Sequence, residues 1–219
     1  MPKSKRDQKV TLSKTQKKGR ARKETILQEV RGCVGQYGAA YVFTAENMRN
    51  AALKDVRAKL ASSRIFFGRN KLIAAALGRT SAEEQADGLS QVAKAVLGGE
   101  AGLIFTSKSA AELRRVFDET QVAEFARAGV EATRDVELDA GPLAGFPHSM
   151  EPYLRKLGLP SRLEAGVVTL LAAHTVCTEG EALTSDQAKL LQLLGIKMAV
   201  FKLSLKCRWA EGEFESYEE

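Results

Sequence analysis

Residues 64–77 read RIFFGRNKLIAAAL, a stretch that contains one complete strand–turn–helix unit. The apolar run at 64–67 predicts a strand, and the apolar positions at 72–77 predict a helix. Gly68 stands between them, where glycine makes a turn without steric cost. Other parts of the chain repeat this order, which predicts the α/β class, with a small mixed sheet covered by helices.

The same two patterns extend over most of the chain. We expect a helix from 24 to 38, a strand at 39–43, a helix at 48–60, a helix at 81–97, a strand at 102–106 and a helix at 110–117. Ser109 and Glu112 have the spacing of a capping box before the last of these helices. Residues 201–205 alternate between apolar and polar types, which predicts a further strand of the same sheet.

Proline and glycine interrupt the region 125–184, which holds four of the five prolines of the chain. Because these residues break regular elements, we expect a smaller inserted α+β domain here. The organisation that we predict has four parts: a basic N-terminal arm at 1–23, a discontinuous α/β domain at 24–124 and 185–209, the insertion domain at 125–184, and a short acidic tail at 210–219.

Charge is distributed unevenly along the 219 residues. The formal net charge is +6, but residues 1–23 hold ten cations and one acid, so the remainder of the chain sums to −3. A cationic arm suits a polyanion such as RNA, because cations that neutralise phosphates release condensed counterions. A nuclear-import signal or a solvated tail explains the same charge, and charge alone leaves these alternatives open.

Several classes of protein lack their sequence signatures here. Cys33, Cys177 and Cys207 are far apart and form no CxxC motif, so neither a disulfide framework nor a metal site is indicated, and a reducing intracellular compartment is expected. The N-terminus is too charged for a secretion signal, and no apolar run reaches the roughly 18–20 residues of a membrane span. We therefore expect a soluble protein that contacts no membrane.

A catalytic constellation is missing from the sequence as well. There is no GxGxxG, GxSxG or GxxxxGK[ST] motif, so Gly68 and Lys71 do not form a nucleotide loop of the P-loop type. His148 precedes Ser149 in a proline-broken segment, where a surface or capping histidine is the ordinary explanation. We predict no catalytic residue, no cofactor and no small-molecule substrate.

Cations cluster between positions 49 and 71, namely at Arg49, Lys54, Arg57, Lys59, Arg64, Arg69 and Lys71. If Asn70 caps the helix after the turn at Gly68, backbone N–H groups and the positive end of the helix dipole face outward between Arg69 and Lys71. Such an arrangement holds an RNA phosphate. An ordinary turn with solvated cations is the alternative, and the local sequence favours neither.

Long blocks in order resemble the family of the large-subunit ribosomal stalk-base protein, which includes the assembly factors called mRNA turnover protein 4. The blocks are MPKSKR with the later KKGR, YVFTAENMRNAALKDVR, RIFFGRNKLIAAALGR, GLIFTS, and FPHSMEPYLRKLGLP followed by GVVTLL. FPHSMEP and the later LLGIKMAVFKLSLKCRW are more similar to the assembly factors than to the mature stalk-base protein. The resemblance covers almost the whole chain.

This resemblance implies an rRNA-binding α/β domain interrupted by an insertion domain. Carried over position by position, it places rRNA contacts on the arm, on the start of the helix after residue 48, and on the turn after residue 67. The residues implied are Lys5, Arg6, Lys9, Lys14, Lys17, Lys18, Arg20, Arg22, Arg49, Asn50, Lys54, Arg57, Gly68, Arg69, Asn70 and Lys71. Arg69 stands where relatives often have lysine, which keeps the charge but changes the donor geometry.

The partners that the resemblance implies are the large-subunit rRNA at the stalk base, in the GTPase-associated centre, the pre-ribosomal particle with its neighbouring ribosomal proteins, and a phosphatase-like release factor. The implied location is the nucleolus and nucleus, with shuttling to the cytoplasm on pre-ribosomes as an extension. Competitive occupancy of the stalk-base site is the expected role. The alternatives are a mature stalk-base ribosomal protein, against which the short C-terminal region argues, and an RNA-processing enzyme, for which no catalytic constellation is present.

Overall fold

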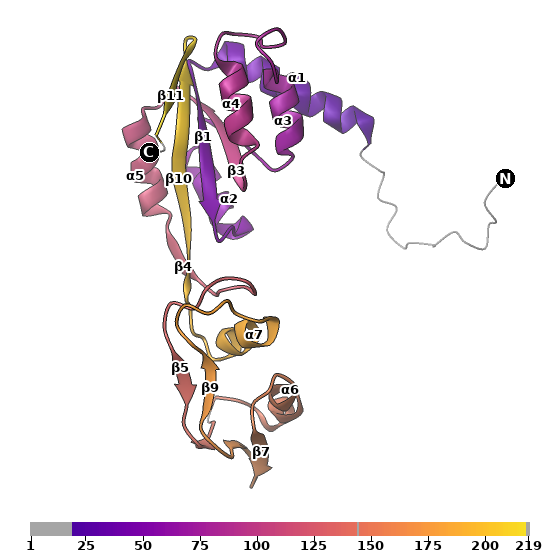
Figure 1. The fold of residues 1–219 in the computed structure, drawn as a ribbon, viewed down its shortest axis with the longest axis vertical. Coiled ribbons are helices and arrows are strands. Elements are labelled where there is room, and N and C mark those ends of the chain that lie inside the picture. Colours follow the sequence, from indigo (N-terminus) through magenta and orange to yellow (C-terminus); the bar gives the residue numbers. More distant parts are fainter. Residues whose placement is uncertain (1–18, 144, 218–219) are drawn as a thin grey trace, which may run out of the picture.

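The computed structural model describes residues 19–143 and 145–217. Figure 1 shows two parts that follow one another along the long axis of the molecule. The upper part contains α1 (Arg20–Gln36), β1 (Ala39–Glu46), α2 (Asn50–Lys59), β2 (Arg64–Phe67), α3 (Asn70–Leu77), α4 (Leu89–Val96), β3 (Ala101–Thr106), α5 (Ala110–Glu119), β4 (Val122–Glu124), β10 (Ala199–Ala210) and β11 (Glu213–Ser216). The expected helices and strands are therefore present, and the first helix begins at Arg20 instead of position 24.

The strands of the upper part form one sheet in the order β11–β10–β1–β3–β2, and β4 pairs with the start of β10. All of these pairs are antiparallel, so the expectation of a mixed sheet is wrong in this detail. The physical reason lies in the position of β3. β1 and β2 run in the same direction, as a strand–helix–strand crossover requires, but β3 lies between them and opposes both.

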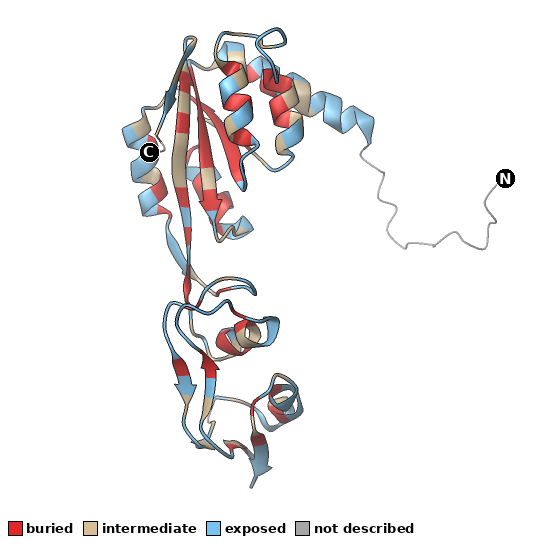
Figure 2. Ribbon diagram, in the orientation of Figure 1, coloured by how far each residue is buried: buried red, intermediate tan, exposed pale blue. Residues whose placement is uncertain are grey.

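Helices cover both faces of this sheet, which is why its central strands are apolar on both sides. On one face α1, α3 and α4 pack against side chains that include Val42, Leu103 and Phe105. On the other face α2 and α5 pack against Tyr41 and Ile104. All residues of β3 are buried, and Figure 2 shows the buried positions concentrated along the central strands and the inner sides of the helices.

Glycine at position 102 permits the close packing of three strands. A Cβ atom placed on Gly102 would lie 2.4 Å from the ring of Phe43. That ring stacks on the ring of Phe67 with a centroid separation of 5.9 Å. The missing side chain on β3 thus allows aromatic residues from the strands on either side to meet across it.

The helix expected over 81–97 is shorter than its apolar pattern suggested, because α4 begins only at Leu89. Gly88 precedes it with φ of +84°, a conformation that interrupts a helix. The Glu84 carboxylate accepts a hydrogen bond of 2.8 Å from the backbone N–H of Ser90, and this bond lowers the pKa of Glu84. The Trp209 indole N–H donates to the carbonyl of Asp87 at 2.8 Å, which ties the same loop to β10.

The lower part has its own hydrophobic core. It contains β5 (Val136–Leu138), β6 (Gly141–Pro142), the 3-10 helix η2 (His148–Met150), α6 (Glu151–Lys156), β7 (Ser161–Glu164), β8 (Val167–Leu170), β9 (His174–Cys177) and α7 (Ser185–Leu193). Leu154, Val168 and Val176 are buried in this core. Helix α7, which sequence analysis assigns to the first domain, also contributes Leu190 and Leu191 to it.

The three cysteines lie in the protein interior. Cys33, Cys177 and Cys207 are all buried, and burial raises the pKa of the Cys33 and Cys177 thiols. Within the described ranges, no helix combines the length and the apolar character that a bilayer crossing needs. Nor do the described His, Cys, Asp and Glu side chains form a group of three or more suited to a metal ion.

Candidate nucleic-acid interface

The turn between β2 and α3 places two cations at the edge of the sheet. Gly68 has φ of +81°, and Arg69 follows with φ of +59° and ψ of +40°. The expected turn at Gly68 is therefore confirmed. Two consecutive left-handed residues reverse the chain direction within a short distance, so the side chains of Arg69 and Lys71 emerge where the edge strand ends.

The expectation that Asn70 caps α3 is wrong. Arg69 is the N-cap residue, and its carbonyl accepts from the N–H groups of Leu72 and Ile73 at 2.7 and 3.2 Å. The left-handed turn extends one residue further than expected, which makes Asn70 the first residue of the helix. No side chain caps α3, so the amides of its first turn face outward without a capping acceptor.

Two grooves adjoin at this turn. The groove that we call the apolar groove has a volume of about 500 Å³ and is lined by Met48, Phe67, Gly68, Arg69, Asn70, Lys71, Leu97, Gly99, Glu100 and Ala101. The groove that we call the cationic groove has a volume of about 530 Å³ and is lined by Lys23, Arg69, Lys71, Leu72, Ala75 and Arg79. Arg69 and Lys71 belong to both, so one pair of cations separates an apolar surface from a basic one.

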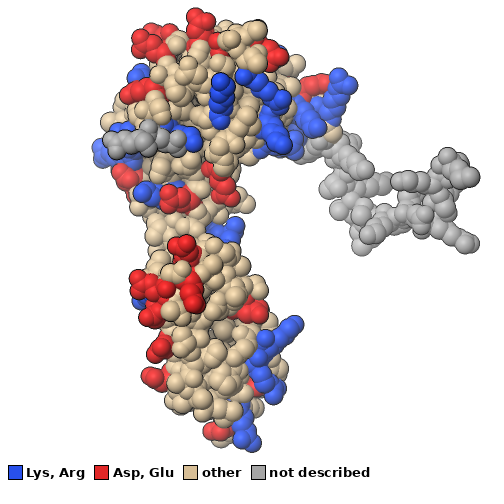
Figure 3. Space-filling model, viewed as in Figure 1, with Lys and Arg blue, Asp and Glu red and all other residues tan. Residues whose placement is uncertain are grey.

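The cationic groove contains two residues that sequence reasoning did not assign to the site. Lys23 comes from α1 and Arg79 from the end of α3, where its guanidinium donates to the carbonyl of Lys71 at 3.4 Å. Arg79 follows Lys71 by about two helical turns, a spacing that places both on one side of α3. Figure 3 shows basic side chains gathered over the side of the upper part that α1, α3 and α4 form.

The other predicted residues lie in different places. Lys54 and Arg57 are exposed on α2, which covers the opposite face of the sheet, and Asn50 begins this helix. Arg20 and Arg22 lie on the first turn of α1, and Arg20 pairs with Glu24 at 2.9 Å. The expected contacts at Lys5, Arg6, Lys9, Lys14, Lys17 and Lys18 lie outside the described residues.

Arg49 makes contacts within the protein itself. Its Nε lies 3.6 Å from a carboxylate oxygen of Glu124, and its guanidinium donates to the carbonyl of Phe125. Only 17% of its side chain is exposed. Nearby, the side-chain amide of Asn47 donates to the carbonyl of Val200 at 3.0 Å. These contacts join the start of α2 to both strands that lead into the lower part, so Arg49 occupies the junction between the two parts.

Comparison with known proteins adds the family to this geometry. The family model described as ribosomal protein L10 matches residues 18–122, and a second model, described as the insertion domain in the 60S ribosomal protein of this type, matches residues 126–196. The second range includes α7. We propose, from this match and from the packing of Leu190 and Leu191, that the insertion domain extends to about residue 196.

Individual relatives divide into two groups. The ribosome assembly factor mrt4 of Neurospora crassa is 40% identical over 100% of this chain and 94% of its own length. The factor of the same name from Dictyostelium discoideum is 36% identical over 100% of this chain and 98% of its own length. The large ribosomal subunit protein uL10 of Thermococcus onnurineus is 28% identical over 87% of this chain but only 56% of its own length.

The match to the assembly factors thus extends over nearly the full length of both proteins, whereas the match to the ribosomal protein covers little more than half of that protein. The relatives described above are named as assembly factors or as a ribosomal protein, not as enzymes. These findings confirm the resemblance seen in the sequence and favour the assembly-factor hypothesis over the mature stalk-base protein. The chain belongs to the ribosomal protein L10 family and, within it, to the ribosome assembly factors mrt4.

Proposed function

We propose that this protein assists assembly of the large ribosomal subunit by binding the stalk-base rRNA and occupying the site that the ribosomal stalk-base protein takes later. The observation that carries the proposal is the full-length similarity to ribosome assembly factors, together with the cations around the β2–α3 turn. RNA phosphates at this turn meet Arg69, Lys71, Lys23, Arg79 and the outward-facing amides of α3. Occupancy of a site requires no chemistry, so the proposed role is not enzymatic.

The proposed partners follow from this role. They are the stalk-base rRNA, the pre-ribosomal particle with neighbouring ribosomal proteins, and a phosphatase-like factor that releases the protein. The proposed location is the nucleolus and nucleus. Sedimentation tests the role in cells, because an assembly factor associates with nuclear pre-ribosomes and is absent from polysomes, whereas a mature ribosomal component sediments with polysomes.

Reversal of two charges tests the proposed RNA site. Changing Arg69 and Lys71 together to Glu should lower the affinity for an isolated stalk-base rRNA fragment more than about tenfold and reduce the salt slope by about 2, since each phosphate contact contributes about 0.9 to the slope. Fluorescence anisotropy over a salt titration measures both. Lys156 and Arg162 are exposed in the lower part, so their joint change to Glu is a matched control. Wild-type affinity of a folded Arg69→Glu/Lys71→Glu protein would refute the site.

Deletion of residues 1–18 tests the N-terminal arm separately. Because its cations release counterions without reading sequence, the deletion should flatten the salt dependence and weaken the rRNA fragment and an unrelated RNA to the same degree. An unchanged slope would mean that the arm serves only as an address signal. The deletion leaves Arg20 and the rest of α1 in place.

A further inference from the structure

The apolar groove combines apolar walls with a charged rim. Met48, Phe67 and Leu97 form its apolar surface, and 46% of Leu97 is exposed to solvent. Gly68, Gly99 and Ala101 complete the wall and leave the space between the β2–α3 turn and the α4–β3 loop open. Its volume of about 500 Å³ falls in the range of small-molecule sites, roughly 300–1,000 Å³. An exposed apolar surface of this shape is typical of a binding site.

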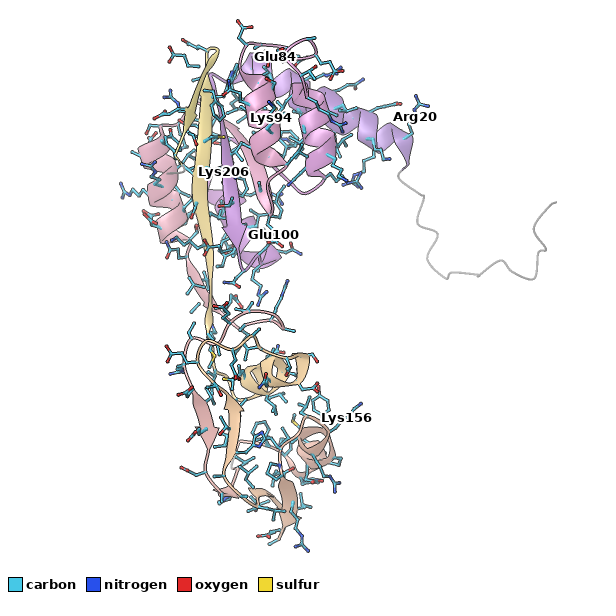
Figure 4. The ribbon with its side chains drawn as sticks, viewed as in Figure 1. Arg20, Glu84, Lys94, Glu100, Lys156 and Lys206 are labelled. Carbon is cyan, nitrogen blue, oxygen red and sulfur yellow. The ribbon has the colours of Figure 1, made fainter. Side chains whose placement is uncertain are left out.

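The polar groups of the groove are unequally distributed. Arg69 and Lys71 stand on one rim, and the exposed carboxylate of Glu100 belongs to the opposite loop. Figure 4 shows Glu100 at the lower end of the upper part, near the start of α2. The side-chain amide of Asn70 donates to the carbonyl of Gly99 at 3.4 Å, while its Oδ1 is buried and accepts no hydrogen bond. The wall therefore offers an acceptor without a donor.

We propose that the apolar groove receives one unstacked nucleobase of the bound RNA, whose flanking phosphates contact Arg69 and Lys71. Sequence-specific RNA recognition targets bases that leave the stack and lie against apolar or aromatic side chains. The charges support this occupant, because the cations on the rim attract a polyanion and the walls exclude water from a flat apolar ring. This proposal deepens the proposed function and rests on it.

The acceptors of the groove select among the bases. The buried Oδ1 of Asn70 and the carboxylate of Glu100 accept hydrogen bonds, and an exocyclic amino group donates them. Adenine and cytosine carry such a group on the Watson–Crick edge, whereas uracil carries carbonyl oxygens there, which would face these acceptors. The structure thus assigns the groove to an amino-bearing base, with Glu100 as the residue that discriminates against uracil.

An abasic scan of the stalk-base rRNA fragment tests the proposal with the full chain. At one nucleotide, removal of the base should weaken binding to the wild-type protein about tenfold, which is the cost of losing one stacked base. In the Met48→Ala/Leu97→Ala variant the same removal should cost less than about twofold, because the walls that hold the base are gone. Substitution of uracil at that nucleotide should weaken wild-type binding and have less effect on Glu100→Gln.

Controls separate this proposal from the proposed function. Leu171→Ala removes a leucine that is 57% exposed in the lower part, and it should keep the full abasic penalty. If the double variant fails to fold, as judged by its thermal melt, Leu97→Ala alone replaces it, since this exposed side chain supports little of the core. Salt-dependent binding that needs Arg69 and Lys71, with no abasic position costing more than about twofold, overturns the base site and leaves the RNA site intact. Absence of salt-dependent binding overturns both.

Discussion

Arg69 joins backbone strain to a binding position. Its φ of +59° lies in the left-handed region, where a residue with a side chain is less stable by about 1–2 kcal/mol. Glycine would adopt the same conformation without this cost. The residue nevertheless lines both the apolar and the cationic groove, so its guanidinium reaches either surface from one backbone position. Strain of this kind persists where a side chain serves another purpose.

Replacement of Arg69 by Gly separates these two effects. We expect the free energy of unfolding to rise by up to about 1 kcal/mol, because glycine relieves the left-handed strain, while the affinity for rRNA falls. Urea denaturation followed by circular dichroism measures the first effect. Arg79→Gly is the control: Arg79 does not have a positive φ, and its replacement should lower the stability. A less stable Arg69→Gly protein would show that the turn is not strained.

Side-chain roles were harder to predict from the sequence than residue types. The glycine turn at position 68 followed from its place between an apolar strand and an apolar helix. The cap at Asn70 did not form, because a second left-handed residue moved the helix start, and no sequence rule identifies an arginine in that conformation. Arg49 is part of a cationic cluster in sequence, and only the fold brings Glu124 and Phe125 to its guanidinium.

At the scale of elements, α5 shows how local sequence specifies a helix start. Ser109 accepts from the N–H of Glu112, and the Glu112 carboxylate accepts from the N–H of Ser109, as the capping-box spacing predicted. These hydrogen bonds from Ser109 lower the pKa of Glu112 below its usual value of 4.5. A carboxylate with a lowered pKa in the folded state stabilises the protein above its unfolded pKa and loses this effect as the pH falls.

The stability of Glu112→Gln relative to the wild type should therefore depend on pH. The wild type should be the more stable of the two at neutral pH, and the difference should shrink as the pH falls below 4.5, where the Glu112 carboxylate takes up a proton. Thermal melts from neutral pH to about pH 3 measure the difference across the range in which carboxylates titrate. Glu83→Gln removes an exposed carboxylate outside any capping box, and its difference should change less. A pH-independent difference would contradict the charged cap.

Element prediction succeeded where local pattern decides and failed where distant contacts decide. Strand β2 and the capping box of α5 match the expectation, because their apolar runs and cap residues lie within a few positions of one another. Helix α4 is short because Gly88 and the bond between Trp209 and Asp87 hold the preceding loop away from helical geometry. The antiparallel order of the sheet depends on β3 entering between β1 and β2, which periodicity does not reveal.

At the scale of the whole molecule, the two parts are joined by β4 and the start of β10. These strands pair at Ala199–Glu124, Val200–Ala123 and Phe201–Val122. Arg49 and Asn47 add side-chain contacts from the loop before α2 to the same two strands. The start of a helix that carries predicted rRNA contacts is thereby tied to the orientation of the insertion domain.

Arg49→Ala should loosen this connection. Spin labels on cysteines introduced at the exposed positions Ala111 and Glu164 should give a broader distance distribution in the variant, measured by double electron–electron resonance. The salt slope of rRNA binding should stay unchanged, because the Arg49 guanidinium is occupied by Glu124 and Phe125. Lys54→Ala is the control for an exposed α2 cation and should leave the distances unchanged. An Arg49→Ala protein with unaltered distances and a slope lower by about 1 would make Arg49 an rRNA contact.

The single tryptophan gives the upper part a spectroscopic signal of its own. Trp209 is 5% exposed and its indole donates to the carbonyl of Asp87, so its emission depends on the contact between β10 and the loop before α4. The insertion domain contains no tryptophan. Tryptophan fluorescence therefore follows unfolding of the sheet domain alone, whereas far-ultraviolet dichroism follows both parts. Non-coincident transitions by these two probes would resolve whether the protein unfolds in one step or in two.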